Sequence, residues 1–212
     1  MSTYDLEEQE QLAALRAWWK QYSGIVTVVL IGILLTLSAW QGWNWYQRNQ
    51  AGQAASIYEQ LQKAVRVNDI KASRDATGSI LEQYPRTIYA PLAALLSAKI
   101  HYQAGDLKTA RVQLQWAVDH APSIQFKSIA RLRLANVLVD DQAPEEAAKL
   151  LEEKAIDEYE ALFSIARGDI LLSQKKLQEA RTAYKSALNS PAKLDSSMRE
   201  LVQLKLDALG ES

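Results

Sequence analysis

The chain has 212 residues, a formal net charge of −1 and no cysteine. Its balanced charge argues against a nucleic-acid-binding surface, which needs an excess of Lys and Arg. The lack of cysteine excludes disulfides, thiolate metal sites and cysteine nucleophiles, and the length fits one helical domain with an appendage.

Residues 1–22 form a short acidic tail. Four carboxylates outnumber its two basic residues, Arg16 and Lys20. This composition is unlike the short basic start of a cleaved signal peptide. Leu12 and Leu15 recur at helical spacing, which predicts a helix that leads into the next segment. We interpret the tail as a solvated cap on a membrane helix, with a partner-binding role as an alternative.

A long uncharged run follows the tail, from Gln21 to Gln47. A bilayer core of about 30 Å needs about 20 helical residues, so the run is long enough to span it. Tryptophan rings, which favour the two membrane interfaces, bracket the run. These predicted interface residues are Trp18, Trp19, Trp40, Trp43 and Trp45. We predict a single transmembrane signal-anchor helix over residues 23–46.

Two alternatives to an anchor fit the run less well. A buried helix of a soluble protein rarely runs this long without a charge, and a cleaved signal peptide would have a small-residue cleavage site after its apolar stretch. The orientation follows from the flanking cations, since Arg16 and Lys20 precede the span while Arg48 follows it. This difference of one cation favours a cytoplasmic N-terminus.

Beyond the anchor, residues 47–212 contain internal repeats and read as all helix. Three stretches align without gaps: "ALLSAKIHYQAGDLKTARVQLQWAVDHAP", "RLRLANVLVDDQAPEEAAKLLEE" and "SIARGDILLSQKKLQEARTAYKSALNSP". Small residues recur where two antiparallel helices would approach most closely. These repeat-packing positions are Ala98, Ala110, Ala135, Ala147, Gly168 and Ala180.

The spacing between the aligned stretches resembles that of the tetratricopeptide repeat, which has a period of about 34 residues. We predict an all-α fold, in which the transmembrane helix precedes a tetratricopeptide-repeat-like solenoid. The solenoid would comprise a degenerate unit, three repeats and a capping helix that covers the last repeat. Their expected ranges are 51–85, about 91–124, 128–160 and 161–194, and 196–209.

A concave surface lined by the first helix of each pair is the predicted binding site. Its mixed polar and apolar side chains suit an extended or helical polypeptide. The repeat register assigns it Leu95, Lys99, Tyr102, Gln103, Leu132, Asn136, Asp140 and Asp169. Each of these residues could equally be ordinary surface.

Catalytic chemistry finds little support in the sequence. The two histidines, His101 and His120, belong to no zinc-protease motif, and no phosphate-binding or nucleophile-elbow motif occurs. We therefore predict a protein that is not an enzyme and that needs no metal or cofactor.

The order of parts resembles the YfgM family, the ancillary SecYEG translocon subunits of Gram-negative bacteria. The stretches that carry the resemblance are "WQGWNWYQRNQ", "YAPLAALLSAKIHYQAGDLKTA", "ARGDILLSQKKLQEARTAYKSAL" and "MRELVQLKLDAL". The resemblance implies a single-pass protein of the bacterial inner membrane, with its N-terminus in the cytoplasm and its C-terminal domain in the periplasm. It also implies association with SecYEG and with PpiD, a periplasmic chaperone, and a link to RcsB through the cytoplasmic tail.

Two hypotheses of function follow. In the first, the repeats form a membrane-anchored binding module beside the translocon that links translocated polypeptides to periplasmic chaperones. In the alternative, they scaffold another envelope complex of the inner membrane.

Overall fold

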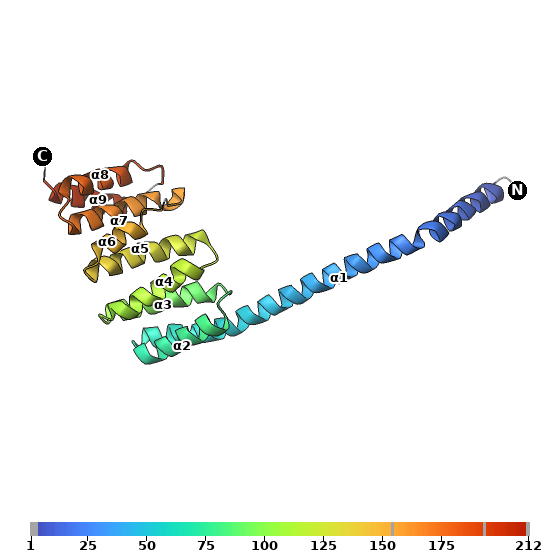
Figure 1. Cartoon of the computed structure of the whole chain (residues 1–212), viewed down its shortest axis with the longest axis horizontal. Helices are drawn as coiled ribbons and strands as arrows, with labels where there is room; N and C mark the ends of the chain where they lie inside the picture. The colour runs from blue at the N-terminus through green and yellow to red at the C-terminus, as the bar shows by residue number, and fades with distance from the viewer. Residues whose placement is uncertain (1–3, 154, 193, 211–212) are drawn as a thin grey trace. The chain divides into compact units, whose positions relative to one another are not determined.

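The computed structural model describes residues 4–153, 155–192 and 194–210, and within these ranges it contains helices and no strand (Figure 1). This confirms the predicted all-α class, with an apolar helix ahead of repeated helix pairs. The helices are α1 (Tyr4–Arg66), α2 (Ile70–Gln83), α3 (Tyr89–Gln103), α4 (Leu107–His120), α5 (Ile124–Asp140), α6 (Pro144–Leu150), α7 (Glu160–Ser173), α8 (Leu177–Leu188) and α9 (Ser196–Ala208), with a short 3₁₀ helix, η1 (Asp157–Tyr159), before α7.

The chain divides into two compact units between Asn49 and Gln50. The first unit is the N-terminal part of α1, and it contains the expected membrane segment, 23–46. Its apolar side chains face outward: Leu35 is 66% exposed and Trp45 is 68% exposed. All five predicted interface tryptophans are likewise exposed. Such an exposed apolar surface on a helix is suited to contact with lipid.

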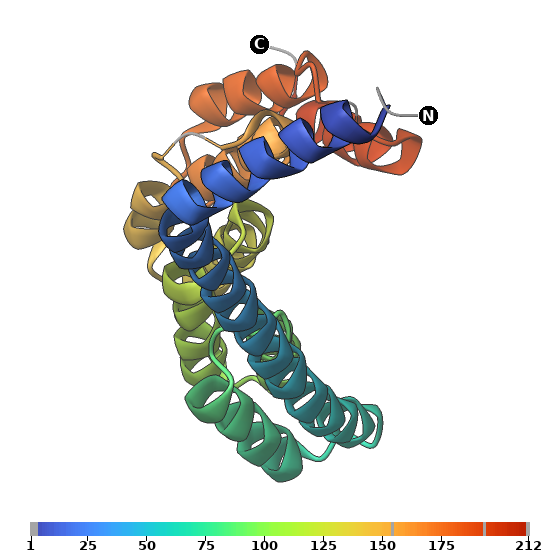
Figure 2. The same cartoon turned by 90° about the vertical axis from the view of Figure 1, so that its right-hand side faces the viewer.

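The second unit begins with the last turns of α1 and continues to the C-terminal end of the chain. Figure 1 and Figure 2 show its helices as a stack, with α2 at one end and with α8 and α9 together at the other. Asp side chains begin several of them, because a carboxylate at the N-cap accepts a hydrogen bond from a backbone N–H that the helix leaves unpaired. Asp69 accepts from Ala72 N at 2.9 Å, and Asp106 from Thr109 N at 3.0 Å.

One turn geometry recurs between the two helices of every pair. Asn68, Gly105, Gln142 and Lys175 all have a left-handed φ of 58° to 78°, at intervals of 37, 37 and 33 residues. In each case the following N–H bonds back into the last turn of the first helix, as Asp106 N does to the His101 carbonyl at 2.9 Å. This Schellman closure satisfies carbonyls that would otherwise lack a partner. The backbone therefore repeats four times, and the last turns of α1 act as the first helix of the first pair.

Small residues lie where the paired helices meet. Ala110, Ala135, Ala147 and Ala180 have no exposed surface, and Ala98 and Gly168 are also buried. Among the glycines, Gly168 makes the closest approach, since an added Cβ would overlap Cε1 of the buried Tyr184. The helix pair α7 and α8 can therefore close on the Tyr184 ring only because residue 168 has no side chain.

The third pair has a shortened second helix, because α6 ends at Leu150 and an irregular segment leads to α7. Two arginines hold this segment. The buried Arg131 donates to the Leu150 carbonyl at 2.8 Å and the Glu153 carbonyl at 3.0 Å, and it pairs with the Glu153 carboxylate at 3.1 Å. Arg167 donates to the Leu151 carbonyl at 3.1 Å. The arginines thus replace the hydrogen bonds that a longer helix would have supplied.

We predict that Gly168→Ala destabilises the second unit by about 1–3 kcal/mol, because the new methyl group overlaps the Tyr184 ring. Urea unfolding of the full-length chain in detergent micelles, followed by far-ultraviolet circular dichroism, measures the change. Gly78→Ala is the matched control. Its Cβ would meet nothing within 4 Å in the interior of α2, so it should stabilise by about 0.5–1 kcal/mol. Equal effects of the two substitutions would contradict this account of Gly168.

We also predict that Arg131→Met lowers the free energy of unfolding by about 2–3 kcal/mol, since it strands the carbonyls of Leu150 and Glu153 without a donor. The same urea titration measures it. Arg199→Met, at an exposed position of α9, should change stability by no more than about 0.5 kcal/mol. A neutral result for Arg131→Met would mean that the segment after α6 does not depend on this clamp.

Candidate protein-binding groove

A cavity of about 310 Å³ lies between the first helices of the second and third pairs. Side chains of α3 and α5 form its walls, and α4 contributes to its floor. The lining residues are Ala98, Lys99, Tyr102, Leu114, Arg133, Asn136 and Val137. Three of the eight predicted groove residues, Lys99, Tyr102 and Asn136, are therefore brought together.

Helical periodicity explains why these positions meet. Residues 98, 99 and 102 lie within one turn of α3, and residues 133, 136 and 137 lie within one turn of α5, so each set occupies one face of its helix. The floor is apolar and belongs to the core, since Ala98, Leu114 and Val137 are at most 3% exposed. Polar groups therefore surround a small apolar floor.

Tyr102 and Asp140 form a polar contact across the two helices. The Tyr102 hydroxyl donates to Oδ2 of Asp140 at 2.5 Å. This hydrogen bond, together with partial burial, raises the pKa of Tyr102 above its ordinary value. The Asp140 carboxylate is therefore already hydrogen-bonded before any ligand arrives.

The cations at the cavity lack carboxylate partners. Lys99 and Asn136 make no hydrogen bond or ion pair within the part of the chain that the structure describes. The Arg133 guanidinium reaches only a neutral group, the Leu95 carbonyl, with Nη1 at 3.5 Å. The walls thus present two positive charges and an amide toward the cavity.

The other predicted groove residues lie elsewhere. Leu95 is buried in the core, and Leu132 is partly buried against the same core. Gln103 is exposed but does not line the cavity. Asp169 accepts from the Tyr184 hydroxyl at 2.6 Å and also binds Lys205, so its carboxylate links α7, α8 and α9.

Sequence reasoning did not single out Arg133 or Val137 as groove residues. Both stand within one helical turn of Asn136, so the same register that selected Asn136 could have found them. Leu114 lines the floor from α4, which only the folding of α4 beneath α3 and α5 reveals.

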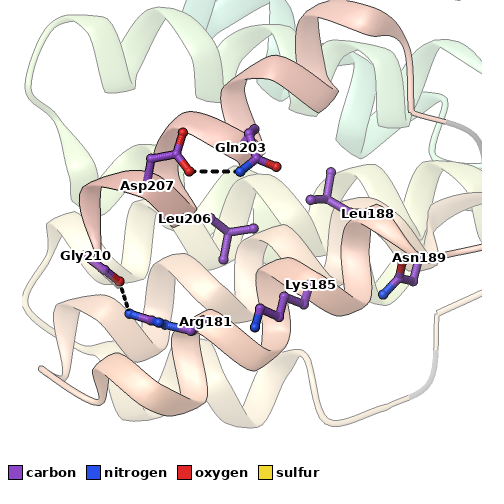
Figure 3. A pocket seen from close by; sticks show the side chains of 8 residues that line it. All are labelled: Arg181, Lys185, Leu188, Asn189, Gln203, Leu206, Asp207 and Gly210. Atoms are coloured by element: carbon purple, nitrogen blue, oxygen red, sulfur yellow. Dashed lines mark hydrogen bonds between the residues drawn. The ribbon is translucent and has the colours of Figure 1, made fainter. Parts of the chain in front are cut away.

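A second cavity, of about 530 Å³, lies between α8 and α9 (Figure 3). Several of its polar groups contact one another or the end of the chain. Arg181 donates to the Leu209 carbonyl at 3.1 Å and to the Gly210 carbonyl, and Gln203 donates to Asp207 at 2.9 Å. These contacts fasten the end of α9 to α8, so we assign this cavity a structural role.

The two histidines serve the fold. His101 is fully buried, and its Nδ1 lies 3.0 Å from Oδ2 of Asp106. Hydrogen bonds from Thr109, and secondarily from His101, lower the pKa of Asp106. His120 stacks on Trp116 with ring centroids 4.9 Å apart. Among the described residues, no group of three or more His, Asp or Glu side chains is placed to hold a metal ion.

Comparison with known proteins gives one consistent result. The family model of the tetratricopeptide repeat-like domain matches residues 16–211. Proteins named ancillary SecYEG translocon subunit are similar over nearly their whole length. The relative from Neisseria gonorrhoeae is 28% identical over 96% of this chain and 98% of its own. Those from Escherichia coli and Haemophilus influenzae are 26% and 25% identical, covering 99% and 93% of this chain and 99% and 97% of their own.

Proposed function

Because the chain belongs to the tetratricopeptide repeat-like family, whose model spans both the anchor and the repeats, we propose that it is a membrane-anchored, protein-binding subunit associated with the SecYEG translocon. The observation that carries the proposal is the extent of the similarity. The ancillary SecYEG translocon subunits of the three species named above match at 93–99% of this chain, so the likeness includes the membrane segment and is not confined to generic repeats.

The exposed surface of α1 supports membrane attachment. Among the helices that the structure describes, α1 is the one long and apolar enough to cross a bilayer, and its apolar stretch is not buried by the rest of the protein. Burying such a surface in lipid removes apolar area from water, whereas leaving it exposed would favour aggregation. A single-pass inner-membrane protein accounts for this helix.

The proposed orientation has the tail, residues 1–22, in the cytoplasm and the repeats in the periplasm. The cations beside the span favour it, because Arg16 and Lys20 precede the apolar run and Arg48 follows it. The repeats would then stand where translocated polypeptides emerge.

In this position, the groove between α3 and α5 would receive either an emerging polypeptide or a partner chaperone. Lys99, Tyr102 and Asn136 line an apolar floor, which is the mixture of contacts that polypeptide recognition uses. The finer proposal is that the subunit links translocated polypeptides to a PpiD-like chaperone of the periplasm. A contact of the cytoplasmic tail with RcsB is a further part of it, and it rests on the family resemblance alone. No step of this role requires catalysis.

A crosslinking experiment tests this function. A photoreactive residue at Asn136, which is exposed and lines the groove, should capture a periplasmic chaperone or a nascent chain in intact cells. The same residue at Lys71, exposed on α2, is the control and should capture neither. Purification from gently solubilised membranes should bring SecYEG subunits with the chain. Recovery of a different envelope complex, without SecYEG, would instead favour the scaffold hypothesis.

Protease treatment tests the orientation. In spheroplasts, protease added outside should degrade the second unit, from Gln50 onward, and leave a protected fragment that contains the apolar helix. A tag at the N-terminus should survive until the membrane is permeabilised. Protection of the repeats in sealed spheroplasts would place them in the cytoplasm and remove the proposed access to translocated polypeptides.

A further inference from the structure

The cations of the groove differ from three arginines of the second unit that pair with carboxylates. Arg111 pairs with Glu146 at 2.5 Å, Arg131 with Glu153 at 3.1 Å and Arg167 with Glu160 at 3.1 Å. Those charges are neutralised within the protein. Arg133 contacts only the Leu95 carbonyl, and Lys99 has no partner in the part of the chain that the structure describes. Both line the same cavity.

Asp140 is the acidic residue of α5 that follows the cavity, and it forms no ion pair with Lys99 or Arg133. Asp140 lies one turn beyond Asn136 on α5, and its Oδ2 accepts the hydroxyl proton of Tyr102. It is not part of the cavity lining. Two positive charges at the cavity therefore outnumber the one negative charge of Asp140, so an approaching anion is attracted more than it is repelled.

The floor adds a second requirement. Ala98, Leu114 and Val137 are almost completely buried, so the apolar surface that a ligand can cover includes the ring of Tyr102, which is 43% exposed. The Asn136 amide offers both a donor and an acceptor at the wall. A volume of about 310 Å³ is at the lower end of the range of roughly 300–1,000 Å³ for ligand sites. It accommodates a few side chains of an extended segment.

Resting on the proposed polypeptide-binding function, we propose that this cavity selects an acidic side chain flanked by aliphatic residues. The carboxylate lies between Lys99 and Arg133, with the Asn136 amide as a further donor. The neighbouring aliphatic side chain covers the exposed ring of Tyr102, beside Leu114 and Val137. Charge complementarity selects the occupant, because charge-assisted hydrogen bonds are about twice as strong as neutral ones.

Peptide binding to the full-length chain in detergent micelles tests the inference. The probes are three fluorescent peptides of identical aliphatic sequence whose central residue is Glu, Gln or Lys, with amidated C-termini so that only the side chain differs. Fluorescence anisotropy measures their affinity. The Glu peptide should bind roughly tenfold more tightly than the Gln peptide, and the Lys peptide most weakly. Equal binding of the Glu and Gln peptides, or preference for Lys, overturns the proposal.

Substitutions locate the effect. Lys99→Gln and Arg133→Gln should each weaken binding of the Glu peptide by roughly tenfold and leave the Gln peptide almost unchanged. Asp140→Asn should strengthen binding of the Glu peptide, because it removes a competing negative charge. Lys108→Gln, at an exposed position of α4 outside the cavity, should have no effect. Weakened binding of the Glu peptide by Asp140→Asn would contradict the assignment of charge.

The outcomes separate this inference from the proposed function. If SecYEG subunits still purify with the chain but no peptide shows a carboxylate preference, only the inference fails. If the Glu peptide binds as expected but SecYEG is absent from the purified membranes, the translocon assignment fails. If Lys99→Gln changes the oligomeric state in analytical ultracentrifugation, the cavity is occupied by a second copy of the chain, and the inference is overturned.

Discussion

The close approach of paired helices at small side chains is the constraint on which the second unit depends. Backbones pack tightly only where no side chain intervenes, and the resulting interior is too dense to accept an added methyl group without strain. At Gly168 this limit is reached, because the Tyr184 ring occupies the space of a Cβ. Tyr184 in turn donates to Asp169, whose carboxylate also binds Lys205 of α9. One missing side chain thus permits the contacts that fasten the last helix to the stack.

Arginines serve two different purposes in this stack. Arg131 and Arg167 donate to backbone carbonyls after α6 and pair with carboxylates, which stabilises an irregular segment between two helices. Arg133 lies on the same helix as Arg131 but at the cavity, where no carboxylate neutralises it. A charge whose partners come from within the fold contributes to stability, whereas a charge left at a cavity is available to a partner.

The two parts of helix α1 differ in what surrounds their side chains. Its apolar stretch exposes large aliphatic and aromatic side chains, whereas in its last turns Ala54 and Leu61 are fully buried in the second unit. The same local periodicity continues through both parts, and only the surroundings of the side chains change. An uncharged surface of this length fits the hydrocarbon core of a bilayer.

Local spacing along the chain was sufficient to predict the apolar helix, the helical class and the repeated pairs. A charge-free run, small residues at a fixed interval and turn residues between them require no knowledge of distant contacts. The partners of polar side chains could not be predicted in this way, because they come from other helices. The register placed Asp169 in the groove, yet α8 and α9 bring Tyr184 and Lys205 to its carboxylate. Likewise, Arg131 reaches the end of α6 from α5, and Arg133 and Lys99 line one cavity from separate helices. Periodicity assigns a side chain to a face of its helix, but what that face meets is set by how the helices pack.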